Sequence, residues 1–305
     1  MRDHIGTIRR PRRLIGSLVV CLLAASCRGG TPPSSAPPAP TVPVPTTGTP
    51  GSTAASPVPT EPGLLAADLE TVTDDLRGSI DAWSASGETS TWPPPTSLVL
   101  QALAQQRIYG TLARDPRLLR DVLRRLPPGL RGEARANATA GAQLLSILRT
   151  SGHTPTIRTR APPPADLLLR YYRQAERRFG VAWQLLAAVN FIESKFGRVV
   201  TASSAGAQGP MQFIGPTWAA YGLGGDVHDP HDAILGAANY LHASGAPGDE
   251  RGALFHYNPS RAYVDAVILY ARQMMRDPRN FYAYYNWQVF IRTSSGLKQL
   301  TGPGS

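Results

Sequence analysis

The 305-residue sequence predicts a mainly α-helical protein with a short extended arm near its C-terminus. Apolar residues recur at helical spacing in several pieces between residues 64 and 148, and again between residues 165 and 275. Proline and glycine residues separate these pieces. Residues 281–293 are instead aromatic and β-branched, and the latter part of this stretch predicts a strand or an extended packing arm. We expect residues 296–305 to form a loose tail.

The first 27 residues have the pattern of a lipoprotein signal peptide. A leader with five Arg precedes an apolar run from Leu14 to Ala25, which is shorter than the ~20 residues that cross a membrane. The run ends at Cys27, where cleavage and acylation are expected. This predicts an exported lipoprotein of the cell envelope, anchored through Cys27 to the outer face of the cytoplasmic membrane. Cys21 would leave with the signal, so no disulfide can form in the mature chain.

Residues 28–62 predict a disordered tether. Eleven of these residues are Pro, and the others are almost all Thr, Ser, Ala, Gly and Val. Such a segment cannot bury a core. In extended polyproline geometry it would reach on the order of 100 Å, far enough to hold a folded body away from a membrane.

Residues 63–155 predict a helical accessory region. Breaks that contain Pro divide it into four expected helices, at residues 64–84, 97–113, 116–126 and 130–149. Its many Arg predict solvated helix faces and not a nucleic-acid site, because no aromatic residues are interleaved with them. The whole chain has a net charge of +10, of which about +6 remains without the first 27 residues, and this positive charge suits long-range attraction to an anionic cell envelope.

The stretch from Val181 to Phe196 predicts a buried helix that ends at Gly197, and it follows a helix that begins near Asp166 and ends at Gly180. Glu193 falls in the last turn of the second helix. Apolar side chains lie along the same stripe, and the helix C-terminus adds partial negative charge. Both effects raise the pKa of a carboxyl group.

An acid that keeps its proton near neutral pH can donate it to a leaving group, so Glu193 is a candidate general acid. The alternative is that Glu193 is solvated or paired with Lys195 or Arg198. The following loop, from Ser203 to Gln212, favours the catalytic interpretation because its small residues let a backbone approach a ligand. Gln212 offers a donor and an acceptor to an N-acetyl group, and Met211 offers an apolar wall.

This stretch resembles the catalytic core of bacterial lytic transglycosylases, in the lysozyme-like superfamily. Glu193-Ser194 is similar to the family's catalytic Glu-Ser pair, and Ser203 to Gln212 is similar to its substrate-groove loop. Three further blocks follow in the family's order: Asp229-Pro230-x-Asp232-Ala233-Ile234, Ala238-x-Tyr240-Leu241 and Tyr257-Asn258. The resemblance spans about residues 164–275. It implies a lysozyme-like transglycosylase domain over residues 160–295.

The resemblance also implies an activity, cleavage of the β-1,4 bond between N-acetylmuramic acid and N-acetylglucosamine in peptidoglycan. Glu193 would protonate the glycosidic oxygen and then accept a proton from the muramic acid 6-hydroxyl, which leaves a 1,6-anhydro ring. The substrate-binding residues implied by the family pattern are Ser203, Met211, Gln212, Tyr257 and Asn258. No cofactor is expected. The expected partners are peptidoglycan strands, the membrane through Cys27, and proteins of wall synthesis or division, with no nucleic acid.

Two other functions remain open. A hydrolytic lysozyme of the same fold would use an acid such as Asp226 or Asp229 to activate water. A non-catalytic, peptidoglycan-binding lipoprotein would keep the groove without turnover, although the presence of Glu193 counts against it. Asp229 precedes a Pro and therefore predicts a helix N-cap, with Asp232 in the first turn.

Two histidines, His228 and His231, lie close to these acids and raise the question of a metal site. Their spacing does not match a calcium loop with alternating oxygen ligands, so we predict no metal. His256, just before the Tyr257-Asn258 block, is expected to be a surface or packing residue.

Overall fold

A computed structural model describes residues 58–148, 156–293 and 296–305. The proposed signal peptide, Cys27 and all of the proposed tether except its last five residues lie outside this part of the chain. The described residues form eleven α-helices, one 3-10 turn and a two-stranded sheet. The mainly helical class predicted from the sequence is therefore confirmed.

The accessory region contains the four helices that the sequence predicts, each within two residues at either end. They are α1 (Pro62–Ala85), α2 (Thr96–Arg114), α3 (Pro116–Arg125) and α4 (Pro128–Ile147), with the 3-10 turn Glu88–Ser90 between the first two. Side-chain caps explain where two of these helices begin. The carboxylate of Asp115 accepts hydrogen bonds from the backbone N–H groups of Arg117 and Leu118, and Glu61 caps α1 in the same way.

The rest of the described residues form seven more helices and the hairpin. The elements are α5 (Ala165–Phe179), α6 (Trp183–Ser194), α7 (Gly215–Tyr221), α8 (Pro230–Ala243), α9 (Glu250–Tyr257), α10 (Arg261–Arg276), α11 (Arg279–Asn286), β1 (Phe290–Thr293) and β2 (Gly296–Gln299). Gly180 ends α5 in the left-handed conformation, as predicted. The predicted end of α6 at Gly197 is wrong, because the helix stops at Ser194, after which Lys195 and Phe196 already have φ values of 53° and 61°.

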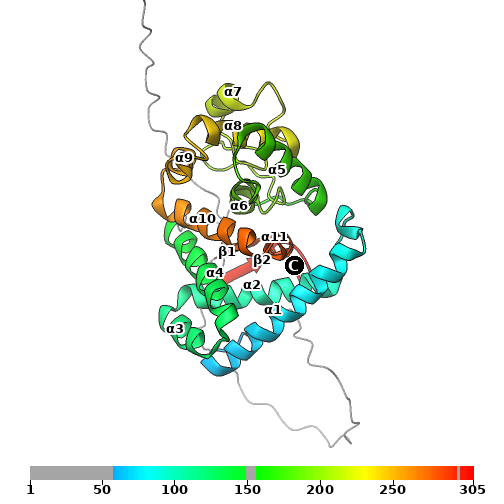
Figure 1. The fold of residues 1–305 in the computed structure, drawn as a ribbon, viewed down its shortest axis with the longest axis vertical. Coiled ribbons are helices and arrows are strands. Elements are labelled where there is room, and N and C mark those ends of the chain that lie inside the picture. The colour runs from blue at the N-terminus through cyan, green and yellow to red at the C-terminus, as the bar shows by residue number, and fades with distance from the viewer. Residues whose placement is uncertain (1–57, 149–155, 294–295) are drawn as a thin grey trace, which may run out of the picture.

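Helix α10 lies across the middle of the molecule. On one side it packs against α4 of the accessory region, and on the other against α6, which carries Glu193 (Figure 1). Helices α5, α7, α8 and α9 lie beyond α6 in the same view. A single apolar cluster contains buried residues from both the accessory region and the later helices, so the two regions share one core.

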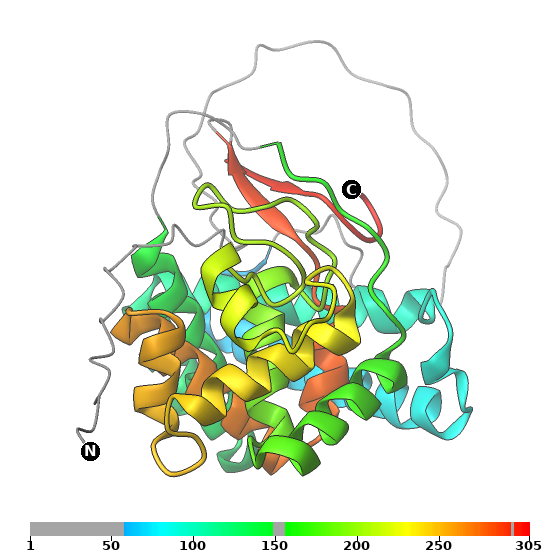
Figure 2. The same ribbon diagram turned by 90° about the horizontal axis from the view of Figure 1, so that it is seen from above.

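The C-terminal residues correct a second expectation. Residues 296–299 are not part of a loose tail, because they form β2 and pair antiparallel with β1 (Figure 2). Beyond the strand, the N–H of Leu300 donates to the carbonyl of Val289 over 2.8 Å. Val289 also packs with Val199, Ile157 and Leu300 in a small apolar cluster. Burial of these side chains orders the C-terminal segment, although its composition alone predicts little order.

Among the residues that the structure describes, none of the helices combines the length and apolar character needed to cross a membrane.

Candidate active site

Glu193 occupies the last turn of α6 and is almost fully buried, with 6% of its surface exposed. The hydroxyl of Tyr263 donates a hydrogen bond to Oε1 over 2.7 Å. Burial raises the pKa of Glu193 from 4.5 to about 8, and the hydrogen bond from Tyr263 opposes part of this rise. The carboxyl group is therefore set to hold its proton at neutral pH, as the sequence predicts.

Tyr263 is a site residue that the sequence did not reveal. The helical spacing of apolar residues up to residue 275 predicts an amphipathic helix from Tyr263 to Met275, but gives Tyr263 no role at the site. In the structure it lies in the first turn of α10, fully buried, where Ser260 caps the helix by accepting from the N–H of Tyr263. Burial, followed by the charge of Glu193, raises the pKa of Tyr263 well above its usual value, so the phenol remains a hydrogen-bond donor. A buried Tyr needs a partner for its hydroxyl, which is the signal that could have identified it.

The interpretation in which Glu193 pairs with a neighbouring cation does not describe this site. The guanidinium of Arg198 lies 5.3 Å from the ring centre of Trp92 and 5.1 Å from that of Tyr285. Burial lowers its pKa to about 10. The ammonium of Lys195 lies 3.5 Å from the ring centre of Phe191. Within the described residues, the hydrogen-bond partner of the Glu193 carboxyl is Tyr263.

The side chain of Ser194 links the end of α6 to the loop from Ser203 to Gln212. Its hydroxyl donates to the carbonyl of Pro210 over 2.6 Å and accepts from the N–H of Gly197 over 2.8 Å. A hydroxyl can do both at once. The residue next to the acid therefore fixes the loop from Ser203 to Gln212 relative to Glu193.

The loop itself is held by short-range hydrogen bonds. The hydroxyl of Ser203 accepts from the N–H groups of Ala205 and Ala207, at 3.3 and 3.0 Å. Gln212 has a φ of 51°, and its side-chain amide donates to the carbonyl of Gly209 over 3.0 Å. Ser203 and Gln212 thus shape the loop, and Gln212 remains half-exposed.

Gly209 is required where the loop meets the segment before α8. Its φ is +74°, and a Cβ built there would lie 1.9 Å from the carbonyl oxygen of Val227. Only glycine allows this approach without a backbone shift.

Tyr257, at the end of α9, closes the other side of the site. Its hydroxyl donates to the carbonyl of Met211 over 2.6 Å. Met211 has no exposed surface, and its side chain belongs to the core. The expectation that Met211 forms an apolar wall of the substrate groove is therefore wrong. Asn258 follows as the half-exposed C-cap of α9, and within the described residues its side-chain amide makes no hydrogen bond. That amide is free to meet a ligand.

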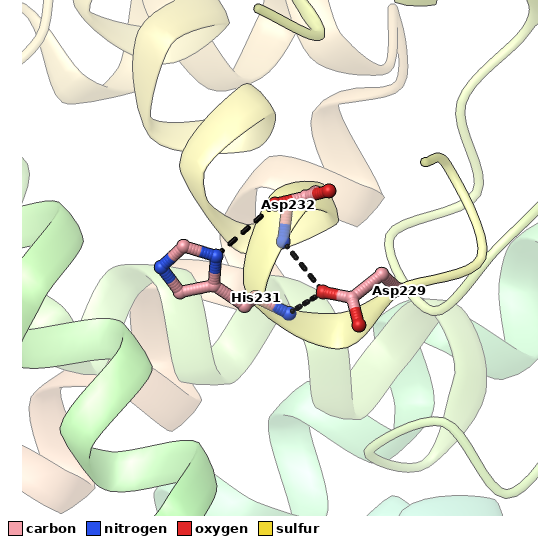
Figure 3. A group of neighbouring side chains, drawn as sticks. All are labelled: Asp229, His231 and Asp232. Carbon is pink, nitrogen blue, oxygen red and sulfur yellow. Dashed lines mark hydrogen bonds and ion pairs between the residues drawn. The ribbon is translucent and has the colours of Figure 1, made fainter. Parts of the chain in front are cut away.

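The acids at the start of α8 have the structural role that the sequence predicts. Asp229 caps the helix by accepting from the N–H groups of His231 and Asp232, at 2.8 and 3.1 Å (Figure 3). Asp232 accepts from the N–H of Asp226 and from Nδ1 of His231. Potential ligand atoms of Asp229, His231 and Asp232 lie within 4.8 Å of one another. The hydrogen bonds to Asp229 go to its Oδ1 atom, whereas both oxygens of Asp232 accept one.

His228 and His256 both lie on the surface. The backbone N–H of His228 donates to the carboxylate of Asp226 over 2.8 Å, which closes a turn in the loop. His256 agrees with the expected surface position.

The fold and the buried acid define a lysozyme-like domain that follows a helical region. Residues 170–276 match the protein family described as "Transglycosylase SLT domain". This part of the chain, from α5 to the end of α10, is therefore a transglycosylase SLT domain, in agreement with the resemblance seen in the sequence.

A curated relative, the membrane-bound lytic murein transglycosylase F of Thiobacillus denitrificans, is 34% identical to the chain over 82 residues. The match covers 27% of this chain and 17% of the relative, so the chain corresponds to less than a fifth of that protein's length. No solved structure matches the chain at a comparable level of significance.

Proposed function

We propose that the protein is a peptidoglycan lytic transglycosylase that cleaves the bond between N-acetylmuramic acid and N-acetylglucosamine and forms 1,6-anhydromuramic acid. The observation that carries this proposal is the buried carboxyl of Glu193, whose pKa of about 8 keeps it protonated until a leaving group needs the proton. The SLT domain and the relative named a lytic murein transglycosylase support the same class of reaction.

The reaction needs one carboxyl group to act twice. Glu193 first donates its proton to the glycosidic oxygen, and the bond from that oxygen to C1 of the muramic acid breaks. The resulting carboxylate then takes the proton of the 6-hydroxyl while O6 bonds to C1. No water is consumed, and Glu193 ends the cycle protonated.

The surroundings of the acid suit this cycle. The hydrogen bond from Tyr263 to Oε1 fixes the carboxyl plane, and it stabilises the carboxylate that exists between the two proton transfers. Intramolecular attack by the 6-hydroxyl avoids the entropic cost of fixing a separate water.

The positions of the other acids favour this mechanism over hydrolysis. Ordinary glycosidases need a second carboxylate to attack the sugar or to activate water. Asp226 and Asp229 accept backbone hydrogen bonds in the loop before α8 and at its N-cap, and neither contributes to the pKa shift of Glu193. Both are accounted for by local structure.

Substrate contacts are assigned to the loop and to the end of α9. Gln212 and Asn258 present half-exposed amides that can bind an N-acetyl group or a peptide stem. Tyr257 lies at the edge of the same site, whereas Ser203 and Met211 act by shaping and supporting the loop.

The mass of the products tests the proposal. Digestion of purified sacculi should release muropeptides that end in 1,6-anhydromuramic acid, one water lighter than the products of a lysozyme. Reducing-end muramic acid as the main product would instead indicate hydrolysis, with Asp226 as the first residue to test. Glu193→Gln, which keeps the shape of the side chain without its transferable proton, should release neither product.

We further propose that the protein acts in the cell envelope, held to the outer face of the cytoplasmic membrane by a lipid on Cys27. The apolar run and the cysteine at its end support this location. Cys27→Ala should move the protein from the membrane fraction to the soluble fraction. Unchanged membrane association would contradict lipid anchoring.

A further inference from the structure

Helix α3 carries four Arg and a single acidic residue, Asp121. It buries Val122 and Leu123 against the core, whereas Arg117, Arg120, Arg124 and Arg125 are exposed. This is an apolar stripe flanked by guanidinium groups, within a single helix of ten residues.

A groove of about 630 Å³ runs along this helix and reaches α4. Its apolar surface comes from Leu119 and Leu123 of α3, and its cationic rim comes from Arg117 and Arg120 of α3 together with Arg135 of α4. All three of these Arg are exposed. The groove therefore combines a leucine floor with positive charge contributed by two helices.

The three Arg of the rim have no ion-pair partner among the described residues. In the described part of the chain, Arg117, Arg120 and Arg135 form no ion pair, whereas Arg124 pairs with Asp121 at 2.7 Å. The one acid that lines the groove, Asp115, already accepts the N–H groups at the start of α3.

The chain cannot supply an acidic occupant from its remaining segments. Residues 1–57, 149–155 and 294–295 contain a single acidic residue, Asp3, which falls in the proposed signal peptide. These segments therefore offer no occupant with complementary charge.

We propose that this groove binds an acidic amphipathic helix of a partner protein, with leucine-like side chains on the floor and Asp or Glu side chains against the three Arg. The choice of this occupant rests on both the leucine floor and the Arg rim of the groove. A phosphate-bearing polymer would match the charge but leave the leucines unused. The accessory region then serves as the docking module that brings the SLT domain to its place of action.

The binding test uses the full chain and a fluorescein-labelled 14-residue peptide of Leu and Glu at helical spacing, followed by fluorescence anisotropy. Two matched peptides separate the contributions of charge and of apolar side chains. One has Gln in place of Glu, and the other has Ser in place of Leu. We expect at least tenfold weaker binding for each of them. Equal binding of the Ser peptide would overturn the proposal in favour of a general polyanion site.

Protein variants locate the binding site. Arg120→Glu/Arg135→Glu should weaken binding of the Leu/Glu peptide at least tenfold, with sacculus clearance unchanged. Arg170→Glu/Arg177→Glu is the matched control, because it makes the same change in charge on exposed positions of α5. Equal weakening by both double variants would show attraction to the overall charge and would overturn the proposal. Arg120→Gln/Arg135→Gln, which introduces no repulsion, should give an intermediate loss, and full affinity in this variant would also overturn it.

Discussion

The proposed reactive group of this protein is a carboxyl that the fold keeps out of water. Glu193 is exposed by only 6%, and its hydrogen-bond partner within the described residues, Tyr263, is a neutral phenol. A nearby cation would have lowered the pKa and removed the proton at neutral pH. The setting of this one residue therefore favours acid catalysis.

Burial of Glu193 predicts a pH-dependent stability. Its pKa rises from 4.5 in the unfolded chain to about 8 in the folded protein, so its contribution to the free energy of unfolding is complete below 4.5 and is lost as the pH rises through 8. The loss is at most about 1.4 kcal/mol per pH unit in this range. Urea unfolding at pH 5 and pH 9 should show that Glu193→Gln removes this dependence. Equal pH slopes in both proteins would contradict the buried, protonated state.

Tyr263→Phe isolates the hydrogen bond to the acid. Its loss should lower turnover by about tenfold, on the order of 1.4 kcal/mol, because the carboxyl is less well oriented. Since this bond lowers the pKa of Glu193, its removal should also move the basic limb of the pH–activity profile to higher pH.

Tyr270→Phe is the matched control for this change. Tyr270 is buried on the same helix, and within the described residues its hydroxyl has no hydrogen-bond partner. The control should leave both the rate and the profile unchanged. A profile that shifts equally in both variants would remove Tyr263 from its positioning role.

At the level of elements, the site depends on how the loop from Ser203 to Gln212 docks on its neighbours. Ser194 holds it to the end of α6, Tyr257 holds it to α9, and Gly209 lies against Val227. Helix α6, helix α9 and the segment before α8 thus position one loop. A fault at any of these contacts should affect activity without touching Glu193.

Gly209→Ala tests the tightest of these contacts. The new methyl group would meet the carbonyl oxygen of Val227 at 1.9 Å, so the loop must shift, and we expect a loss of roughly 2–4 kcal/mol with most of the activity. Gly206→Ala is the matched control, because its φ of +77° carries a similar backbone cost but no atom lies within 4 Å of the added Cβ. It should cost only about 1 kcal/mol in thermal unfolding. Equal losses in the two variants would contradict the role of the Val227 contact.

At the level of the whole molecule, the accessory region and the SLT domain share buried contacts that pass through the C-terminal segment. The side chain of Gln106 on α2 donates to the carbonyl of Gln288 over 2.9 Å and accepts from its N–H over 2.7 Å. Tyr284 donates to Asn137 of α4 over 2.7 Å. The chain therefore returns from the SLT domain to the helices that precede it.

This arrangement predicts one cooperative unfolding transition for residues 58–305. Gln106→Leu should lower the free energy of unfolding by roughly 1–3 kcal/mol, because it leaves two buried backbone groups without partners. Gln101→Leu on the same helix is the control, since its side-chain oxygen is already buried and unpaired and the change should be neutral or stabilising. Circular dichroism and tryptophan fluorescence should give coincident transitions, whereas two separate transitions would contradict the shared core.

The local pattern of the sequence was enough to predict the four helices before residue 148 and helix α5, and to single out Glu193 as the candidate acid. The capped starts at Asp115 and Asp229, and the end of α5 at Gly180, depend on side chains and backbone groups only a few residues apart, so spacing reveals them. The Glu193-Ser194 pair and the loop after it could be found for the same reason. The apolar stripe below Glu193 also gave the direction of its pKa shift.

Only the tertiary structure decided which distant residues complete the site. Tyr263 lies 70 residues after Glu193, and the partner of a buried hydroxyl cannot be found from the periodicity of its own helix. Met211 was placed in the core, and residues 296–299 became a strand, because the burial of each depends on segments far away in the chain. Local sequence determines which conformations a segment favours, whereas solvent exclusion, and with it the pKa of Glu193, depends on everything packed around the residue.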